Sequence, residues 1–293
     1  MSLNKSPKRS LARYGLAPSK KRGQNFLVNP ETARRIVSLG NYSKSEHVIE
    51  VGVGLGALTM KLAEQVHKVI GIELDSGIIR YHETEKILPD NVVLMHADIL
   101  KLDFALLAEQ VPPPFKIIAN LPYSISNPFL FKLIENNTYI STVIVMLQKE
   151  VSDRLTAVPG TKSYGIPTVL LGSFAEVKKR MQVKPAEFHP RPKIDSAVIE
   201  ISFCRHAADL SLANFQRIVR TSFSNRRKTI QNNLSTHTLF PFLNPGDREI
   251  IKKSAILILQ DSNIDPQIRA ERLSVQQFEE LTTAYERLLA CHE

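Results

Sequence analysis

Cysteine is scarce in this chain, which contains only Cys204 and Cys291 among its 293 residues. Two cysteines exclude a cysteine-ligated zinc site and a three-cysteine iron–sulfur cluster, so a radical mechanism of group transfer is disfavoured and we expect no metal. Such low cysteine usage also indicates a reducing compartment. We therefore expect a cytoplasmic protein.

Long apolar runs are missing as well. The longest, at 142–147 and 255–259, are far shorter than the roughly 20 residues that a membrane-spanning helix needs. The basic, polar start of the chain lacks the apolar segment of a signal peptide, so we expect neither a leader nor a membrane partner. The hydrophobic fraction of 43% is nevertheless enough to fill a core, which predicts a globular protein.

Acidic residues are outnumbered, with 29 acids against 38 lysines and arginines and a formal net charge of +9. The first 22 residues contain no acid and predict a basic N-terminal tail, 1–22, while further basic clusters occur at 178–180 and 226–228. Basic patches bind polyanions by releasing counterions. A solvated, solubilising surface has the same composition, so charge alone leaves both interpretations open.

Strand and helix patterns alternate from residue 47 onward. Short apolar runs that are typical of buried parallel strands fall at 47–52, 68–75, 91–98, 115–120 and 142–147. This alternation predicts an α/β domain with a Rossmann-like, mostly parallel sheet, which binds its ligand at the carboxyl ends of the strands. Two further strands, joined by a proline-rich loop, predict an antiparallel strand at the sheet edge; they lie at 174–183 and 197–203.

Strand patterns disappear after about residue 205. The segments that look helical lie at 212–224, 247–260 and 275–291. Ser274 and Gln277 predict a capping box at the start of the last of these helices. We therefore predict a ligand-binding α/β domain over 23–204 and a small all-α C-terminal domain over 205–293.

Glycines follow the first predicted strand, in the segment EVGVGLGA at 50–57. Gly52, Gly54 and Gly56 would let the backbone turn sharply and approach a ligand without an intervening Cβ. The pattern fits both the GxGxG of S-adenosylmethionine sites and the GxGxx[GA] of dinucleotide sites. Alone it does not separate these cofactors, or either of them from a structural turn.

Carboxylates end the next two predicted strands. Glu73 lies 21 residues after Gly52, where a carboxylate accepts hydrogen bonds from the ribose hydroxyls of a nucleotide cofactor. Asp98 ends the third strand, where it can accept a hydrogen bond from the amino group of a cofactor adenine. An exposed aspartate that caps a helix would also explain Asp98. Glycine or acid at three successive strand ends nevertheless favours a nucleotide site.

The fourth predicted strand ends in Asn120-Leu121-Pro122-Tyr123, which matches the [DNS]-[PL]-P-[YF] signature of amino-group methyltransferases. Adenine N6 is a poor nucleophile because its lone pair is delocalised into the ring. The side-chain carbonyl of Asn120 and the backbone carbonyl of Leu121 can accept both N6 hydrogens, which frees that lone pair. Pro122 stiffens the loop, and Tyr123 offers a ring on which an extruded base can stack. An ordinary turn explains the tetrapeptide in isolation, but not its place after the other strand-end residues.

Over about residues 23–278, the chain closely resembles the ribosomal RNA adenine N6-dimethyltransferases. The matching segments are GQNFL (23–27), EVGVGLGALT (50–59), IELD (72–75), NLPYSIS (120–126), LQKEVSDRL (147–155), SYG (163–165), FHPRPKIDSAV (188–198), FSNRRKTI (223–230) and RAERLSVQQF (269–278). The resemblance implies a Rossmann-like class I methyltransferase domain with S-adenosylmethionine as cofactor. It implies transfer of two methyl groups to N6 of each of two adjacent adenosines in the 3′-terminal hairpin of small-subunit rRNA. The partner is then this rRNA within a pre-assembled small ribosomal subunit.

The resemblance also implies roles for single residues. It places Asn25 and Leu27 over the cofactor, the three glycines along its methionine portion, and Glu73 and Asp98 on its ribose and adenine. Asn120 would lie between cofactor and target base, and Tyr123 and Phe188 would form the two aromatic walls of the target pocket. Arg226, Arg227 and Lys228 would meet RNA phosphates and make 205–293 an RNA-binding domain, although a cluster that satisfies a helix macrodipole is an alternative.

Four other functions are consistent with parts of this sequence. The sister family that methylates large-subunit rRNA usually lacks the LQKEV, SYG and FxxRRKT elements, all of which are present here. An NAD-dependent oxidoreductase would explain the glycines and Glu73, but not the NLPY segment. A non-catalytic RNA-binding assembly factor stays open, because intact motifs disfavour it only mildly. A DNA adenine methyltransferase is disfavoured by the length of the resemblance and by the lack of a base-reading domain.

Overall fold

The computed structural model describes residues 24–204 and 210–292. The predicted basic tail, 1–22, lies outside these ranges. The chain divides into two compact units: one comprises residues up to Ser152 together with Glu176–Cys204, and the other comprises Asp153–Ala175 together with the residues after Cys204. The chain passes from the first unit to the second after Cys204, near the predicted boundary at residue 205. The segment Asp153–Ala175 also belongs to the second unit, although it lies within the predicted first domain.

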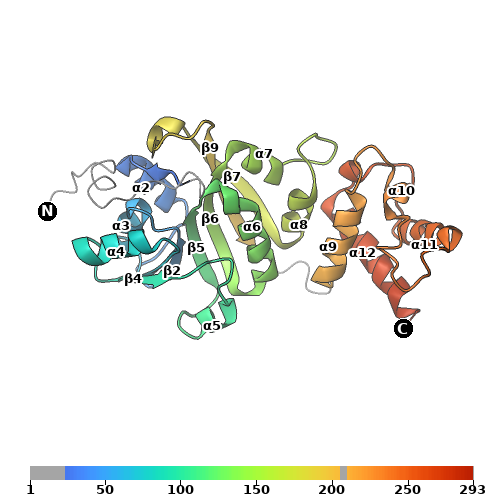
Figure 1. Cartoon of the computed structure of the whole chain (residues 1–293), viewed down its shortest axis with the longest axis horizontal. Coiled ribbons are helices and arrows are strands. Elements are labelled where there is room, and N and C mark those ends of the chain that lie inside the picture. Colours follow the sequence, from blue (N-terminus) through green and yellow to red (C-terminus); the bar gives the residue numbers. More distant parts are fainter. Residues whose placement is uncertain (1–23, 205–209, 293) are drawn as a thin grey trace. The chain divides into compact units, whose positions relative to one another are not determined.

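A seven-stranded sheet forms the centre of the first unit, in the order β4-β3-β2-β5-β6-β9-β7 (Figure 1). The pairs β2–β3, β3–β4, β2–β5 and β5–β6 are parallel, and β9 runs antiparallel to β6. The predicted mostly parallel, Rossmann-like sheet with an antiparallel strand toward one edge is confirmed. The strands are β2 (His47–Val51), β3 (Lys68–Glu73), β4 (Val92–His96), β5 (Phe115–Asn120), β6 (Ile140–Gln148), β7 (Ala175–Val183) and β9 (Ser196–Phe203).

The strand order reverses direction beside β2. From β2 the chain moves outward through β3 to β4, and it then returns to place β5 on the other side of β2. Helices that leave β2 and β5 must diverge at such a point, which opens a crevice at the carboxyl ends of the two strands. In the register of this pair, Val51 lies opposite Ala119, so Gly52 comes to lie beside Asn120.

Helices of the first unit connect the strands (Figure 1). Asn29 caps α2 by accepting hydrogen bonds from the amides of Glu31 and Thr32, and Asp75 caps α4 by accepting one from Gly77. A ladder of two residues on each side, β1 (Phe26–Leu27) with β8 (Phe188–His189), was not predicted because it is too short to show a strand pattern. The helices are α2 (Pro30–Ser38), α3 (Ala57–Ala63), α4 (Ser76–Glu85), α5 (Phe104–Ala108), η1 (Tyr123–Ile125), α6 (Ser126–Glu135), η2 (Asn137–Tyr139), α7 (Lys149–Leu155, which runs into the second unit) and η3 (Pro185–Glu187).

The described part of the second unit is helical, as predicted for its C-terminal portion. Its additional member, α8 (Ile166–Phe174), packs against α9 and α12 because apolar residues surround it on most sides and have to be covered. The predicted capping box of Ser274 and Gln277 is present at the start of α12. The other elements are α9 (Leu212–Ser222), α10 (Ile230–Leu234), α11 (Arg248–Asp261), η4 (Ala270–Arg272) and α12 (Val275–Ala290). Within the described ranges, no helix has both the length and the apolarity needed to span a membrane.

Candidate cofactor and target-base site

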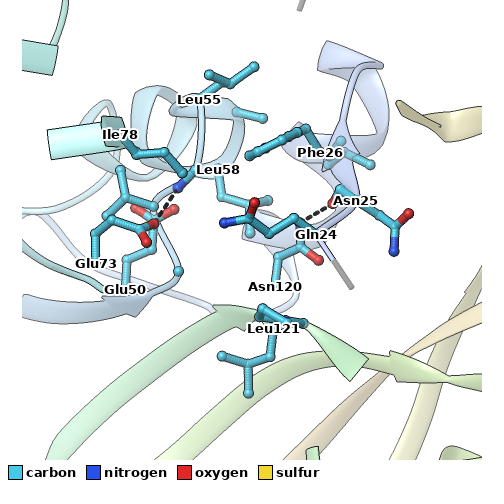
Figure 2. A pocket seen from close by; sticks show the side chains of 16 residues that line it. Gln24, Asn25, Phe26, Glu50, Leu55, Leu58, Glu73, Ile78, Asn120 and Leu121 are labelled. Carbon is cyan, nitrogen blue, oxygen red and sulfur yellow. Dashed lines mark hydrogen bonds between the residues drawn. The ribbon is translucent and has the colours of Figure 1, made fainter. Parts of the chain in front are cut away.

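Two adjoining cavities open at the carboxyl ends of β2, β3, β4 and β5. The first, of about 60 Å³, lies beside the glycine loop, and its lining includes Gln24, Asn25, Glu50, Gly54 and Asn120 (Figure 2). The second, of about 150 Å³, lies over the end of β4, and its lining includes Leu74, Ala97, Asp98 and Ile99. Gln24, Gly52, Glu73, Leu121 and Pro122 line both cavities. An elongated ligand can therefore extend from one cavity into the other.

The glycine loop has the backbone conformation that its sequence predicted. Gly52 and Gly54 have φ angles of 81° and 55°, which side chains rarely adopt. A Cβ on Gly52 would lie 3.0 Å from the backbone oxygen of Asn120, and one on Gly54 would lie 3.2 Å from the ring of Phe26. Both positions therefore need glycine. Gly56 has a φ of 85° and caps α3, but it is not part of the lining of either cavity.

Glu73 is buried at the end of β3 and holds the loops around it. Its two carboxylate oxygens accept hydrogen bonds from the amides of Gly54 (3.0 Å) and Asp75 (2.8 Å). Burial raises the pKa of Glu73, and these two amides partly offset the rise. Each carboxylate oxygen has a second lone-pair position, so Glu73 can still accept hydrogen bonds from a pair of ligand hydroxyls.

Asp98 is half-buried in the wall of the second cavity. Its Oδ1 accepts a hydrogen bond from the amide of Leu100 at 3.0 Å, which forms a turn directly after β4. The competing interpretation from the sequence, an exposed aspartate that caps a helix, does not fit, because Asp98 is half-buried and the next helix, α5, is capped by Asp103. No described residue donates to Oδ2, and this oxygen can accept a hydrogen bond from a ligand amine.

Glu50 also lines the first cavity, although it was not predicted as a site residue. Its side chain is fully buried at the penultimate position of β2, it lines the first cavity, and neither carboxylate oxygen has a hydrogen-bond partner among the described residues. Burial raises the pKa of Glu50 to about 8; the nearby Glu73 carboxylate adds to the rise, and the neighbouring Thr59 moderates it. A buried carboxyl without a partner is costly, so Glu50 is available for a hydrogen bond with a ligand group in this cavity. The sequence signal was the acid within an otherwise apolar strand, two residues before Gly52.

Asn120 and Pro122 lie where the two cavities meet the end of β5. The side-chain nitrogen of Asn120 donates to the backbone oxygen of Asn25 at 3.5 Å (Figure 2). Because that carbonyl can only accept, the side-chain atom of Asn120 that faces it must be the amide nitrogen. Oδ1 of Asn120 is therefore left as the acceptor for a target amine. The phenolic oxygen of Tyr123, next along the loop, lies 2.7 Å from Oγ of the buried Ser196 on β9. This hydrogen bond fixes the half-buried ring, and Ser196 was not predicted as part of the site.

The N-terminal segment closes one side of the first cavity. Asn25 and Leu27 both line it, and their position over the cofactor stays a prediction. Phe188 does not line either cavity: it lies opposite Leu27 in the β1–β8 ladder, is 3% exposed, and belongs to the same buried cluster as Leu27. The structure thus covers the ring that the sequence predicts as a second wall of the target pocket, because β1 packs over it. The wall role of Phe188 stays a prediction.

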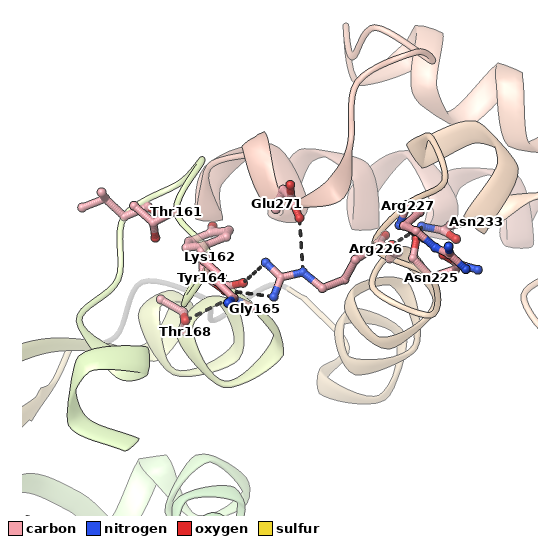
Figure 3. A network of polar contacts seen from close by, with 12 residues as sticks. Thr161, Lys162, Tyr164, Gly165, Thr168, Asn225, Arg226, Arg227, Asn233 and Glu271 are labelled. Carbon is pink, nitrogen blue, oxygen red and sulfur yellow. Dashed lines mark hydrogen bonds and ion pairs between the residues drawn. The ribbon is translucent and has the colours of Figure 1, made fainter. Parts of the chain in front are cut away.

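The three basic residues of the second unit differ from one another. The guanidinium group of Arg226 pairs with Glu271 at 3.2 Å and donates to the backbone oxygens of Lys162 at 2.9 Å and Tyr164 at 3.4 Å (Figure 3). Arg227 and Lys228 are exposed and have no ion pair with a described residue. They precede the N-terminus of α10, where a cation opposes the helix dipole, so the macrodipole interpretation has no support there.

No described residues form a cluster of three or more metal-ligating side chains. The polar groups of the two cavities are amides, carboxylates, the hydroxyl of Ser124 and backbone groups, which suit an organic ligand with hydroxyl and amino groups.

The chain is similar in sequence to a protein family and to several known proteins. A family model described as ribosomal RNA adenine dimethylase matches residues 17–277. A ribosomal RNA small subunit methyltransferase A from Desulfotalea psychrophila is 50% identical over 279 residues, which cover 94% of each chain. A protein of the same name from Syntrophus aciditrophicus is 37% identical over 92% of this chain and 94% of its own. The crystal structure of a dimethyladenosine transferase from Plasmodium falciparum superimposes with a TM-score of 0.76 at 26% identity, over 89% of this chain and 98% of that one.

The family model spans most of the chain, and two relatives exceed 30% identity over more than nine tenths of it. The chain therefore belongs to the ribosomal RNA adenine dimethylase family.

Proposed function

We propose that this chain transfers methyl groups from S-adenosylmethionine to N6 of two adjacent adenosines in the 3′-terminal hairpin of small-subunit rRNA. The product is N6,N6-dimethyladenosine, and the step belongs to maturation of the small ribosomal subunit. The observation that carries this proposal is the position of Asn120–Pro122 at the junction of two cavities lined by acids and glycines. The names of the similar proteins, small subunit methyltransferase A, favour the small-subunit branch over a large-subunit one and give no support to an oxidoreductase.

The residues present fit S-adenosylmethionine in charge and shape. Glu50 offers an unpartnered buried carboxyl to the α-ammonium of the methionine portion, Glu73 offers acceptors to the ribose, and Oδ2 of Asp98 accepts from the adenine amine. Gly52 and Gly54 leave space where a Cβ would fill the loop. When bound, the cofactor supplies an electrophilic methyl group on a positively charged sulfur.

The contribution of the protein to the chemistry is then positioning. Oδ1 of Asn120 and the backbone oxygen of Leu121 accept the two N6 hydrogens of the target adenine, which turns the nitrogen lone pair toward the methyl group. Positive charge develops on nitrogen as the bond forms, and these acceptors stabilise it most at that stage. Tyr123 supplies a stacking face for the extruded base. No strong base is needed, because the methylated amine readily loses a proton to solvent.

A direct test of the activity is incorporation of labelled methyl groups from S-adenosylmethionine into unmethylated small subunits, followed by nucleoside analysis. We expect N6,N6-dimethyladenosine in small-subunit rRNA. Label in large-subunit rRNA would overturn the branch assignment, and absence of any transfer with intact RNA binding would favour the non-catalytic assembly factor.

Replacement of Asp98 by alanine tests the position of the cofactor adenine. We expect S-adenosylmethionine affinity to fall roughly ten- to a hundredfold, because a hydrogen bond to a charged group contributes about 1.5–3 kcal/mol, while RNA affinity stays unchanged. Isothermal titration calorimetry measures both. Asp103→Ala is a matched control, because Asp103 makes the same kind of side-chain bond to the amide of Ala105 but lines neither cavity. Equal affinity losses in the two variants would contradict this role of Asp98.

Charge reversal of Arg227 and Lys228 tests the basic surface of the second unit. We expect Arg227→Glu/Lys228→Glu to weaken RNA binding and to lower the slope of log affinity against log salt by about 0.7–0.9 for each lost phosphate contact. Lys252→Glu/Lys253→Glu makes the same change of charge at exposed positions of α11 and is the control. Arg226→Ala should instead lower the melting temperature, because its partners are protein groups. An unchanged salt slope in the Arg227/Lys228 variant would exclude these residues from the RNA interface.

A further inference from the structure

His82 is a buried histidine that the proposed mechanism does not yet use. It lies in the last turn of α4 and is 3% exposed. One turn earlier on the same face of the helix, Ile78 lines the first cavity. The imidazole therefore lies on the helix face that α4 turns toward the glycine loop.

The ring makes one short hydrogen bond, to the glycine loop itself. Nε2 of His82 lies 2.7 Å from the backbone oxygen of Gly54. A carbonyl oxygen can only accept, so Nε2 carries the proton and donates. Burial lowers the pKa of His82, which favours the neutral imidazole, and Nδ1 is buried without a partner in the described part of the chain. The only polar contact of this ring with the described chain is thus the bond to Gly54.

Gly54 is held from both sides as a result. Its amide donates to Glu73 at 3.0 Å, and its carbonyl accepts from His82 at 2.7 Å. Because glycine has no Cβ, no side chain of its own restricts the peptide planes at this residue, whose φ is 55°. No backbone amide of the described chain donates to the Gly54 oxygen. Without His82 this carbonyl would have no donor from the described chain, and the loop would gain conformations that leave the wall of the first cavity.

We propose that His82 is a positioning residue for the cofactor: its Nε2–H fixes the Gly54 peptide, and through it the glycine loop, in the conformation that receives S-adenosylmethionine. This inference rests on the proposed use of that cofactor. His82 does not touch the reacting atoms, so its loss changes cofactor affinity and leaves the transfer step itself intact. A donor at the Nε2 position is the property that matters, rather than an aromatic ring.

Three substitutions separate this role from simple packing. His82→Leu removes the donor, His82→Gln places an amide nitrogen near the Nε2 position, and His82→Asn reaches only the Nδ1 position. We expect His82→Leu and His82→Asn to weaken S-adenosylmethionine binding about tenfold, and His82→Gln to restore most of the loss. The rate at saturating cofactor should stay within about twofold in all three. His67→Leu, at an exposed site near the opposite end of the strands, is the control and should bind the cofactor normally.

The decisive measurements are calorimetric S-adenosylmethionine affinity and amide hydrogen exchange of residues 52–56 in the cofactor-free protein. Faster exchange of this loop in His82→Leu and His82→Asn, but not in His82→Gln, supports the proposal. Equal losses of affinity and melting temperature in all three variants would show a packing role and overturn it, as would unchanged affinity in His82→Leu. Neither measurement requires methyl transfer, so a failure of the proposed RNA activity would be seen separately.

Discussion

Replacement of Asn120 by alanine is expected to lower the rate of methyl transfer by about a hundredfold or more, with little change in RNA affinity. The substitution removes Oδ1, one of the two acceptors for the N6 hydrogens, and that contact is worth most when charge develops on nitrogen. Stacking on Tyr123 and contacts to phosphates carry the binding of RNA and are retained. Single-turnover methylation with saturating enzyme separates the two quantities.

Variants at the neighbouring positions sharpen this test. Asn120→Asp keeps an oxygen acceptor, so it should retain more of the rate than Asn120→Ala. Tyr123→Ala should reduce both base capture and rate, whereas Tyr123→Phe should be milder because it loses only the bond to Ser196 at 2.7 Å. A loss of RNA affinity in proportion to rate in Asn120→Ala would identify Asn120 as a docking residue, and the proposed chemistry would then be wrong.

Much of the fold was predictable because parallel strands buried on both faces leave continuous apolar runs in the sequence. The five strands from β2 to β6 were each found within about two residues of their ends. The sequence predicts a mostly parallel sheet but not the order of its strands, because the reversal of direction between β2 and β5 depends on contacts across the sheet. The cavity at that reversal follows from topology rather than from any one motif.

The parts that were not predicted depend on contacts between distant residues. The bond from His82 to Gly54 spans 28 positions, and the one from Tyr123 to Ser196 spans 73. Neither has a local sequence pattern. Arg226 looked identical to Arg227 in sequence, and only the fold shows that its guanidinium is bound by Glu271 and two carbonyls. Phe188 matched its motif, yet the ladder with β1 covers its ring.

At pH 8, Glu50 is expected to lower the free energy of unfolding of the cofactor-free protein and to strengthen cofactor binding. The pKa of Glu50 is about 8 in the folded protein, against 4.5 for an ordinary glutamate, because the side chain is buried. Between these two values the folded state holds more protons than the unfolded state, so stability is lost as the pH rises from about 4.5 to about 8. Glutamine does not titrate. Cofactor-free Glu50→Gln should therefore melt at a higher temperature than the parent protein at pH 8, and at nearly the same temperature near pH 5.

Cofactor binding should respond to the same substitution in the reverse sense. A cationic ammonium beside Glu50 favours the ionised carboxylate, so binding near pH 7 releases a proton, and affinity rises as the pH approaches 8. Glu50→Gln removes this charge-assisted bond and should weaken S-adenosylmethionine binding roughly ten- to a hundredfold at pH 8. At lower pH the deficit should shrink, because the protonated parent side chain resembles glutamine.

Calorimetry in two buffers of different ionisation enthalpy measures the proton release, and thermal unfolding across pH 5–8 measures stability. Glu64→Gln, at an exposed carboxylate of the same unit, is the control and should change neither quantity. If Glu50→Gln bound the cofactor as tightly as the parent protein at pH 8, Glu50 would not be the partner of the ammonium. If the two proteins lost stability in parallel between pH 5 and 8, the buried carboxyl would not be the group that titrates. If Glu50 is a buried carboxyl that binds a cationic ligand group, Glu50→Gln should be more stable than the parent protein and should bind the cofactor more weakly.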